Sequence, residues 1–427
     1  MTRTLAATVT VDNTDGLRHV AGPSYNRART INLRFLRFPG REGYLVQAWG
    51  SAFPEDGGGG YQGRLQRAHH DLEASVDVLR RTWQRHVIEN RCQEGDTSRI
   101  RYPFADDWDL SEPDHKRRLA EVGLTLARAG HNTFRMLFHG GDKGLDTIRG
   151  HLLEALRHGE NVISVESDEL IVPWGMLYTG AETTGYPAPA DWSFGGFWGY
   201  RHIIEHTFTR TENFDSRIAV TNPGEVVVGL NVDHEVDAQF PAAPFVTSLI
   251  EFFTPRAKVV LRSSKDELAM AFQDSAFPDH IMCFGCHGKV ATDGVVENPY
   301  LRLSDHEKIY STDLMAWLAD TPLATQPFVF VGACQGGQVS SLFYSAFGKA
   351  LLENGARCLV GPQVDLPPAF ACEYSRRLFT DFLQPGTKLG DIVRSLTRAF
   401  IDDHANPLGL MFTLYRGIDV HLWRDEP

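Results

Sequence analysis

Short apolar runs alternate with amphipathic stretches from about residue 116 to the C-terminus. Such runs predict buried strands, and the stretches between them have the apolar spacing of helices. We expect strands near 162–165, 225–231, 257–261, 279–285, 327–333, 357–361 and 410–415, and helices near 116–129, 146–157, 243–253, 264–273, 311–319, 340–354, 367–383 and 388–403. This alternation predicts an α/β fold, a mostly parallel sheet with helices on both faces.

The first part of the chain has a different pattern. Residues 30–49 nearly alternate between apolar and polar side chains and predict a β-hairpin, and 65–89 predict a charged helix. A polar connection over 103–113 suggests a boundary. We therefore expect a smaller α+β N-terminal region over 1–115, with a regulatory or structural role, and a larger region over 116–427.

Composition excludes several classes of function. The chain has 427 residues, 42% of them apolar and 22% charged, with a net charge of −12. Nucleic-acid binding is not expected, because phosphate contacts need clustered Lys and Arg. The N-terminus has no signal-peptide pattern, and no apolar run approaches the roughly 18 residues that cross a bilayer. The six cysteines lack the spacing of a disulfide framework. These features predict a cytoplasmic protein without membrane contact.

His287 and Cys334 carry the candidate chemistry. Each comes just after a predicted strand, 279–285 and 327–333. Active sites of parallel sheets form at the carboxyl ends of their strands, so the two side chains are expected to meet. A cysteine acts as its thiolate, and a nearby histidine can take the thiol proton. The backbone N–H groups of Gly288 and Cys334 are candidates for an oxyanion hole.

Several motifs resemble those of known peptidases. Ala333-Cys334-Gln335-Gly336 is similar to the caspase nucleophile pattern, in which the histidine lies about 50 residues upstream. More broadly, residues 120–420 resemble the CHAT family of bacterial caspase-like cysteine peptidases related to separase. The similar segments are Asp168–Trp174, Cys286–Gly288, Gly332–Cys334, Gly348–Asp365, Arg394–Ala399 and Phe412–Gly417.

The resemblance implies a caspase–haemoglobinase-like fold and a Cys334/His287 dyad that needs no metal and no cofactor. It also implies an endopeptidase that cleaves one or a few protein substrates. An activating protein or small-molecule signal, and a role in bacterial defence or cell death, are further implications of the family.

This chain departs from the family at two positions. Gly175 stands where Glu is common, and Gly332 stands where Asn is common. Related peptidases that cut after Arg or Lys carry an Asp at the position of Gly332, so that preference is not supported here. Asp365 follows the next predicted strand and could line a substrate pocket. It could equally cap the turn before Pro367.

Three other functions stay open. Gly332-x-Cys334-x-Gly336 also fits the nucleophile elbow of a glutamine amidotransferase or hydrolase, which would need a downstream histidine, His404 or His421. A caspase-like scaffold without activity is a second alternative. Cys283-x-x-Cys286-His287 matches a haem attachment pattern, although a buried strand is a poor place for it. The aromatic cluster Trp192–Tyr200 could stack on a ligand or pack in the core.

Overall fold

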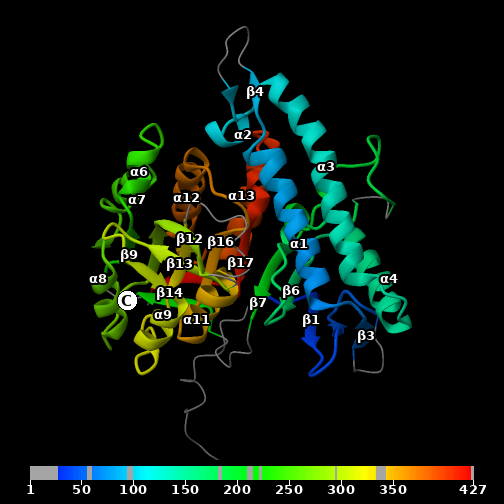
Figure 1. Cartoon of the computed structure of the whole chain (residues 1–427), viewed down its shortest axis with the longest axis horizontal. Coiled ribbons are helices and arrows are strands. Elements are labelled where there is room, and N and C mark those ends of the chain that lie inside the picture. Colours follow the sequence, from blue (N-terminus) through cyan, green and yellow to red (C-terminus); the bar gives the residue numbers. More distant parts are fainter. Residues whose placement is uncertain are drawn as a thin grey trace, which may run out of the picture.

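The computed structural model describes residues 27–54, 60–93, 100–180, 185–208, 215–220, 224–293, 296–332 and 343–424. Over these ranges the chain is a mixed α/β protein in which helices cover a large sheet (Figure 1). The predicted α/β class is confirmed. No helix in the described part of the chain combines the length and the apolar character that a membrane crossing requires.

One sheet of eleven strands runs through the molecule, and most of its strand pairings are parallel. The antiparallel pairings are β16 with β17 and those within β1–β2–β3. The order across the sheet is β10 (Lys258–Arg262), β9 (Val227–Val232), β11 (Ile281–Gly285), β15 (Phe328–Val331), β16 (Cys358–Pro362), β17 (Phe412–Tyr415), β7 (Ile203–Thr207), β6 (Val162–Glu166), β1 (Ile31–Arg37), β2 (Tyr44–Trp49) and β3 (Tyr61–Leu65).

The strands near the site are buried on both faces. Successive side chains of a strand point to opposite faces, and in β11 Ile281 and Cys283 join one apolar cluster whereas Met282 and Phe284 join the other. The first cluster includes side chains of α7 (Phe245–Phe253), α12 (Pro368–Phe382) and α13 (Leu389–Asp402). The second includes those of α8 (Lys265–Gln273), α9 (Ser311–Leu318) and α11 (Lys349–Glu353).

The N-terminal strands extend the same sheet. β1 pairs in parallel with β6, and the predicted hairpin over 30–49 is the antiparallel pair β1–β2. The helices of this part are α1 (His69–Trp83), α3 (Pro113–Phe138) and α4 (Lys143–Arg157). The boundary at residue 115 stays a prediction, although α3 begins close to it.

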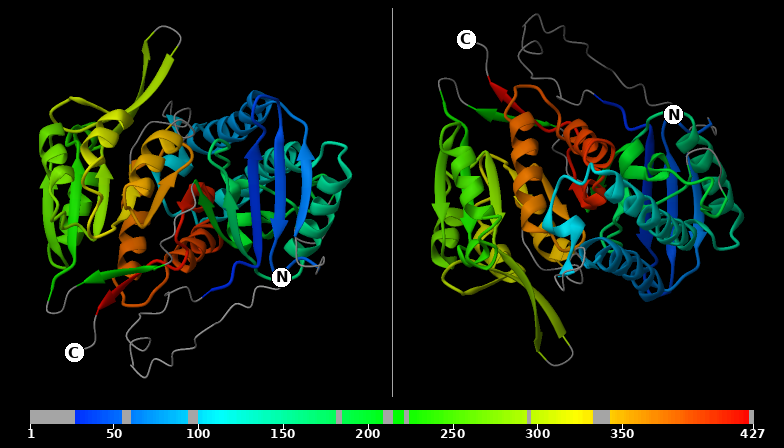
Figure 2. Two further views of the ribbon diagram at one scale, coloured as in Figure 1. Left: turned by 90° about the horizontal axis from the view of Figure 1, so that it is seen from below. Right: turned by 90° about the horizontal axis from the view of Figure 1, so that it is seen from above.

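A hairpin that begins at His287 was not predicted. His287 begins β12 (His287–Asp293), which pairs with β13 (Val296–Arg302). β13 in turn pairs with β14 (Lys308–Tyr310), and this pair is the small hairpin that the sequence over 300–310 suggests. Figure 2 shows the β12–β13 hairpin projecting from the rest of the molecule. Smaller elements are β4 (Cys92–Gln93), β5 (Ile100–Arg101), α2 (Pro103–Asp106), α5 (Trp198–Arg201), α6 (Glu235–Gln239), β8 (Arg217–Val220) and β18 (His421–Arg424).

Candidate active site

The candidate site lies where β9, β11 and β15 end. These three strands are neighbours in parallel, and their registers bring Gly285 level with Val232 and Phe284 level with Val331. The residues that follow are also tied together. Asp233 N donates to Gly285 O at 2.9 Å, and Gly332 N donates to Phe284 O at 2.8 Å. Three features therefore lie together at the carboxyl ends of these strands. They are the segment after β9, the residue His287 and the start of the segment that leads to Cys334.

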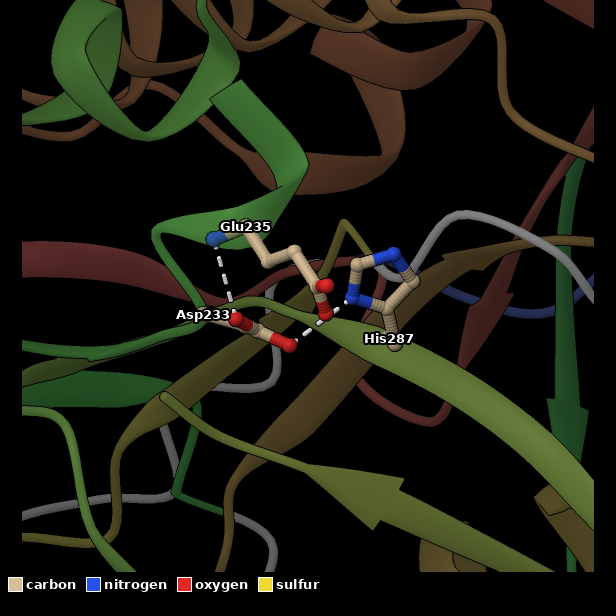
Figure 3. A group of neighbouring side chains, drawn as sticks. All are labelled: Asp233, Glu235 and His287. Atoms are coloured by element: carbon tan, nitrogen blue, oxygen red, sulfur yellow. Dashed lines mark hydrogen bonds and ion pairs between the residues drawn. The ribbon is translucent and has the colours of Figure 1, made fainter. Parts of the chain in front are cut away.

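Asp233 orients His287. The Nδ1 atom of His287 lies 2.8 Å from Oδ2 of Asp233, and the imidazole is only 1% exposed (Figure 3). The other oxygen of Asp233 accepts the Glu235 N–H at 3.0 Å. A hydrogen bond of this kind holds the ring in one orientation and fixes its tautomer.

The carboxylate of Asp233 is held ionised although it is buried. Burial by itself would raise its pKa, but the hydrogen bonds from His287 and the Glu235 backbone, with the charges of His287 and Arg302, lower it below its usual value. A buried carboxylate beside an imidazole stabilises the imidazolium form.

Arg302 completes this charge cluster from the neighbouring strand. It lies opposite His287 in the β12–β13 register, and its Nη2 atom is 3.2 Å from Oδ2 of Asp233. It also pairs with Glu235 at the start of α6. Donor atoms of Asp233, Glu235 and His287 lie within 4.8 Å of one another, a spacing that could suit a metal ion. The Arg302 guanidinium already contacts both carboxylates. The cluster of Asp233, Glu235 and Arg302 is therefore better suited to orienting His287 than to binding a metal ion.

The second nitrogen of His287 points toward α6. Its Nε2 atom lies 3.3 Å from Oε1 of Gln239, the last residue of that helix. This nitrogen is the one left to exchange a proton once Nδ1 is committed to Asp233.

Three other site residues were predicted, and the structure describes two of them, Gly288 and Asp365. Cys334 and its backbone N–H lie outside the described residues. Gly288 is the second residue of β12 and lies opposite Leu301. Asp365 follows β16, the parallel neighbour of β15, and its Oδ2 atom accepts a hydrogen bond from Nε2 of Gln84 at 3.0 Å. The catalytic and substrate-binding roles of these residues stay predictions.

The histidines of the alternative elbow mechanism have other partners. His404 lies beside Asp109 and the Arg377 guanidinium, and His421 lies in β18 with its Nδ1 near Asp419 O. Cys283 and Cys286 are fully buried, and burial raises the pKa of Cys283 well above its ordinary value. Buried thiols of this kind are packing residues and are poorly placed for haem attachment.

Sequence reasoning did not identify the four residues around the imidazole: Asp233, Glu235, Gln239 and Arg302. One signal was available for Asp233, because it follows a predicted buried strand just as His287 does. Arg302 could be found only with the β12–β13 pairing in hand.

No family model matches the chain. A protein of Vitiosangium sp. (strain GDMCC 1.1324), named as a probable protease, is 23% identical over 241 residues, which cover 53% of this chain and 30% of that protein. The chain thus spans less than a third of the length of this relative.

Solved structures with similarity include two of the Saccharomyces cerevisiae separase–securin complex. They align over 92% of this chain and 30% of theirs at 9% identity, with TM-scores of 0.43 and 0.45. The Drosophila initiator caspase Dronc aligns over 51% of this chain and 86% of its own at 10% identity, with a TM-score of 0.27.

Proposed function

We propose that this protein is a cysteine endopeptidase in which Cys334 is the nucleophile and His287 is the general acid and base. The observation that carries the proposal is the Asp233–His287 hydrogen bond, which lies at the carboxyl ends of the neighbouring strands β9, β11 and β15. A histidine held by a buried carboxylate, beside the strand that leads to a cysteine, is an arrangement suited to acyl transfer. Similarity to a protein named as a protease supports the same class of reaction.

The reaction follows from these parts. With Nδ1–H donating to Asp233, Nε2 of His287 takes the thiol proton of Cys334, and the thiolate attacks the peptide carbonyl. The backbone N–H groups of Gly288 and Cys334 would stabilise the oxyanion. His287 then passes the proton to the departing amine, which leaves a thioester that water hydrolyses to regenerate the enzyme.

The substrates we propose are one or a few proteins. β12 is an outer strand of the three-stranded sheet β12–β13–β14, and an outer strand can accept a strand-like peptide through main-chain hydrogen bonds. Asp365 is a proposed substrate contact, and an activating protein or small signal in a bacterial defence pathway remains part of the proposal through the family resemblance. His404 also has a carboxylate neighbour, Asp109, but its Nε2 atom faces the Arg377 guanidinium at 2.9 Å and is not free to take a thiol proton. The amidotransferase alternative therefore gains no support from His404, nor from His421, whose Nδ1 lies beside Asp419 O.

Thiol alkylation tests the dyad without knowledge of the substrate. Purified protein is treated with a limiting amount of iodoacetamide at neutral pH, and modification of each cysteine is followed by peptide mass spectrometry. We expect Cys334 to react faster than the half-buried Cys92 and Cys372, and His287→Ala to remove this advantage by about tenfold or more. Loss of the advantage in His404→Ala, with His287→Ala unaffected, would favour the elbow mechanism instead.

A further inference from the structure

The C-terminal end of α6 reaches the Nε2 nitrogen of His287. Gln239 ends α6 and places its side-chain carboxamide 3.3 Å from Nε2, on the side of the ring away from Asp233. A peptide bond is itself an amide, and the departing amine must approach this same nitrogen. The space beside Nε2 can therefore hold an amide group, and the residues around Gln239 border the bond to be cut.

The turn that follows α6 presents an uncharged, largely apolar surface. Residues 238–244 read Ala-Gln-Phe-Pro-Ala-Ala-Pro, a run with no charged side chain in a chain of net charge −12. Residues 238–242 are all exposed, and Phe240 is 39% exposed. Phe240 follows Gln239 directly in the chain, so an exposed aromatic residue adjoins the residue whose side chain contacts Nε2 of His287.

The charged residues just before the turn are engaged elsewhere. The Asp237 carboxylate accepts the backbone N–H groups of Val246 and Thr247 at 2.8 Å each, which caps the first turn of α7. Glu235 is paired with Arg302. Neither carboxylate is therefore available to attract a basic substrate side chain toward the turn.

The turn is also firmly held. Val236 is buried in the core, Phe240 N donates to Val236 O at 3.2 Å, and Ala243 N donates to Phe240 O at 3.0 Å. A subsite discriminates between side chains only when its walls keep their positions.

We propose that Gln239 and Phe240 form the substrate subsite beside the scissile bond, and that it takes an apolar side chain of a polypeptide substrate at a position adjoining the cut. The inference rests on the proposed function and names its substrate class. Gln239 occupies Nε2 while the site is empty and yields this place to the substrate amide.

The test compares cleavage-site profiles of the full-length wild type, Phe240→Glu and Met270→Glu. Met270 is the matched control because it is an exposed apolar residue, 65% accessible, on α8 at the other face of the sheet. Each protein is incubated with peptides prepared from a whole proteome, and the residues on both sides of every new cut are identified by mass spectrometry. Thermal unfolding and Cys334 alkylation confirm that each variant is folded and reactive.

We expect wild type and Met270→Glu to favour apolar residues at one position adjoining the cut. Phe240→Glu should reduce this preference by about tenfold or more and favour Lys or Arg there, with distant positions unchanged. An active Phe240→Glu with the wild-type profile, or with changes only at distant positions, would overturn the subsite. Absence of both cleavage and Cys334 reactivity in the wild type would instead overturn the proposed function on which the subsite rests.

Discussion

A neutral imidazole has one nitrogen that donates and one that accepts, so the partner of Nδ1 decides what Nε2 can do. In this protein the partner is Asp233, which is fully buried and fixed by a second hydrogen bond from Glu235 N. Burial would raise the pKa of this carboxyl, but the hydrogen bonds from His287 and Glu235 N, with the charges of His287 and Arg302, lower it below its usual value. The role proposed for His287 thus depends on a short stretch at the end of β9.

Asp233→Asn tests this dependence. An amide keeps the shape of the side chain but removes the charge that stabilises the imidazolium, so the thiolate of Cys334 should form only at higher pH. We expect its alkylation at neutral pH to slow by about tenfold or more, and kcat/KM on a cleaved peptide to fall by about 10²- to 10⁴-fold. The measurement is the pH profile of Cys334 alkylation.

The matched control for this variant is Asp274→Asn, which changes an exposed carboxylate that accepts a local turn hydrogen bond from Ala276 N. It should keep the wild-type profile. An unchanged profile in Asp233→Asn would show that Asp233 has a structural role and does not act through His287.

The sequence predicted part of this site because of how its residues are arranged along the chain. His287 and Cys334 stand next to apolar runs and glycines, so each is recognisable locally. Asp233 also follows a strand directly. An Asp at this position is common, however, and it indicates a site only when His287 is known to lie beside it. Gln239 and Arg302 contact the imidazole through tertiary structure, which no local pattern records.

At the level of elements, β7 lies between β17 and β6 in the large sheet, and two buried neutral histidines lie in it or just before it. In β7, His206 accepts a hydrogen bond from Trp174 Nε1 at 2.9 Å. His202, just before the strand, accepts one from Asn161 N at 3.1 Å. Burial lowers the pKa of His206 to about 4, and burial with the nearby Arg201 charge lowers that of His202 to about 3.

These histidines predict a loss of stability in mild acid. Below about pH 6.5 the unfolded chain binds protons at both imidazoles whereas the folded protein does not, so the free energy of unfolding falls as pH decreases toward 4. Each histidine contributes up to about 1.4 kcal/mol per pH unit in this window. Urea unfolding at pH 7, 6, 5 and 4.5 measures the slope.

His206→Phe should reduce that slope by about one histidine's share, although it also lowers stability at pH 7 because Trp174 loses its acceptor. His70→Asn is the control, because the His70 side chain is 80% exposed and should leave the slope unchanged. An equal slope in wild type and His206→Phe would contradict the assignment.

The predictability of the elements follows their burial. Strands such as β9, β11, β15 and β16 are buried on both faces, so apolar runs revealed them. The β12–β13 hairpin was missed because His287-Gly-Lys-Val-Ala-Thr-Asp has no apolar alternation. The pairing of β12 with β13 depends on contacts between the two strands, which local propensity does not record.

At the scale of the whole molecule, the N-terminal segment is part of the sheet that contains the site. β1 pairs with β6 from Ile31↔Ile163 to Arg34↔Glu166. Arg80 of α1, almost fully buried, donates to Gln363 Oε1 at 3.0 Å, and Gln84 contacts Asp365. Helix α1 therefore supports the loop after β16, on the edge where the proposed active site lies.

Removal of residues 1–115 should prevent folding of the remainder. The truncated chain would leave the β6 edge and a large apolar surface uncovered, and exposed strand edges promote aggregation. We expect the 116–427 fragment to lack a cooperative thermal transition and near-UV circular dichroism. The control is co-expression of 1–115 and 116–427 as separate chains, which should associate and recover both signals. A fragment that folds cooperatively alone would contradict this account and support an independent N-terminal module.

The sequence could not reveal this continuity. The alternation of apolar and polar side chains over residues 30–49 predicts a hairpin. Which strand this hairpin pairs with depends on contacts between segments far apart in the chain. Near residue 115 the hydrophobic pattern changes from that of a hairpin and a helix to that of alternating strands and helices. Such a change in the order of elements does not require that the two regions have separate hydrophobic cores.

The most direct test of the central claim is a survey of new protein N-termini in bacterial cells that express wild type, Cys334→Ala, His287→Ala or His404→Ala. We expect new termini in the wild type and in His404→Ala, and their loss in Cys334→Ala and His287→Ala. Persistence of the termini in His287→Ala, or their loss in His404→Ala alone, would contradict the proposed dyad.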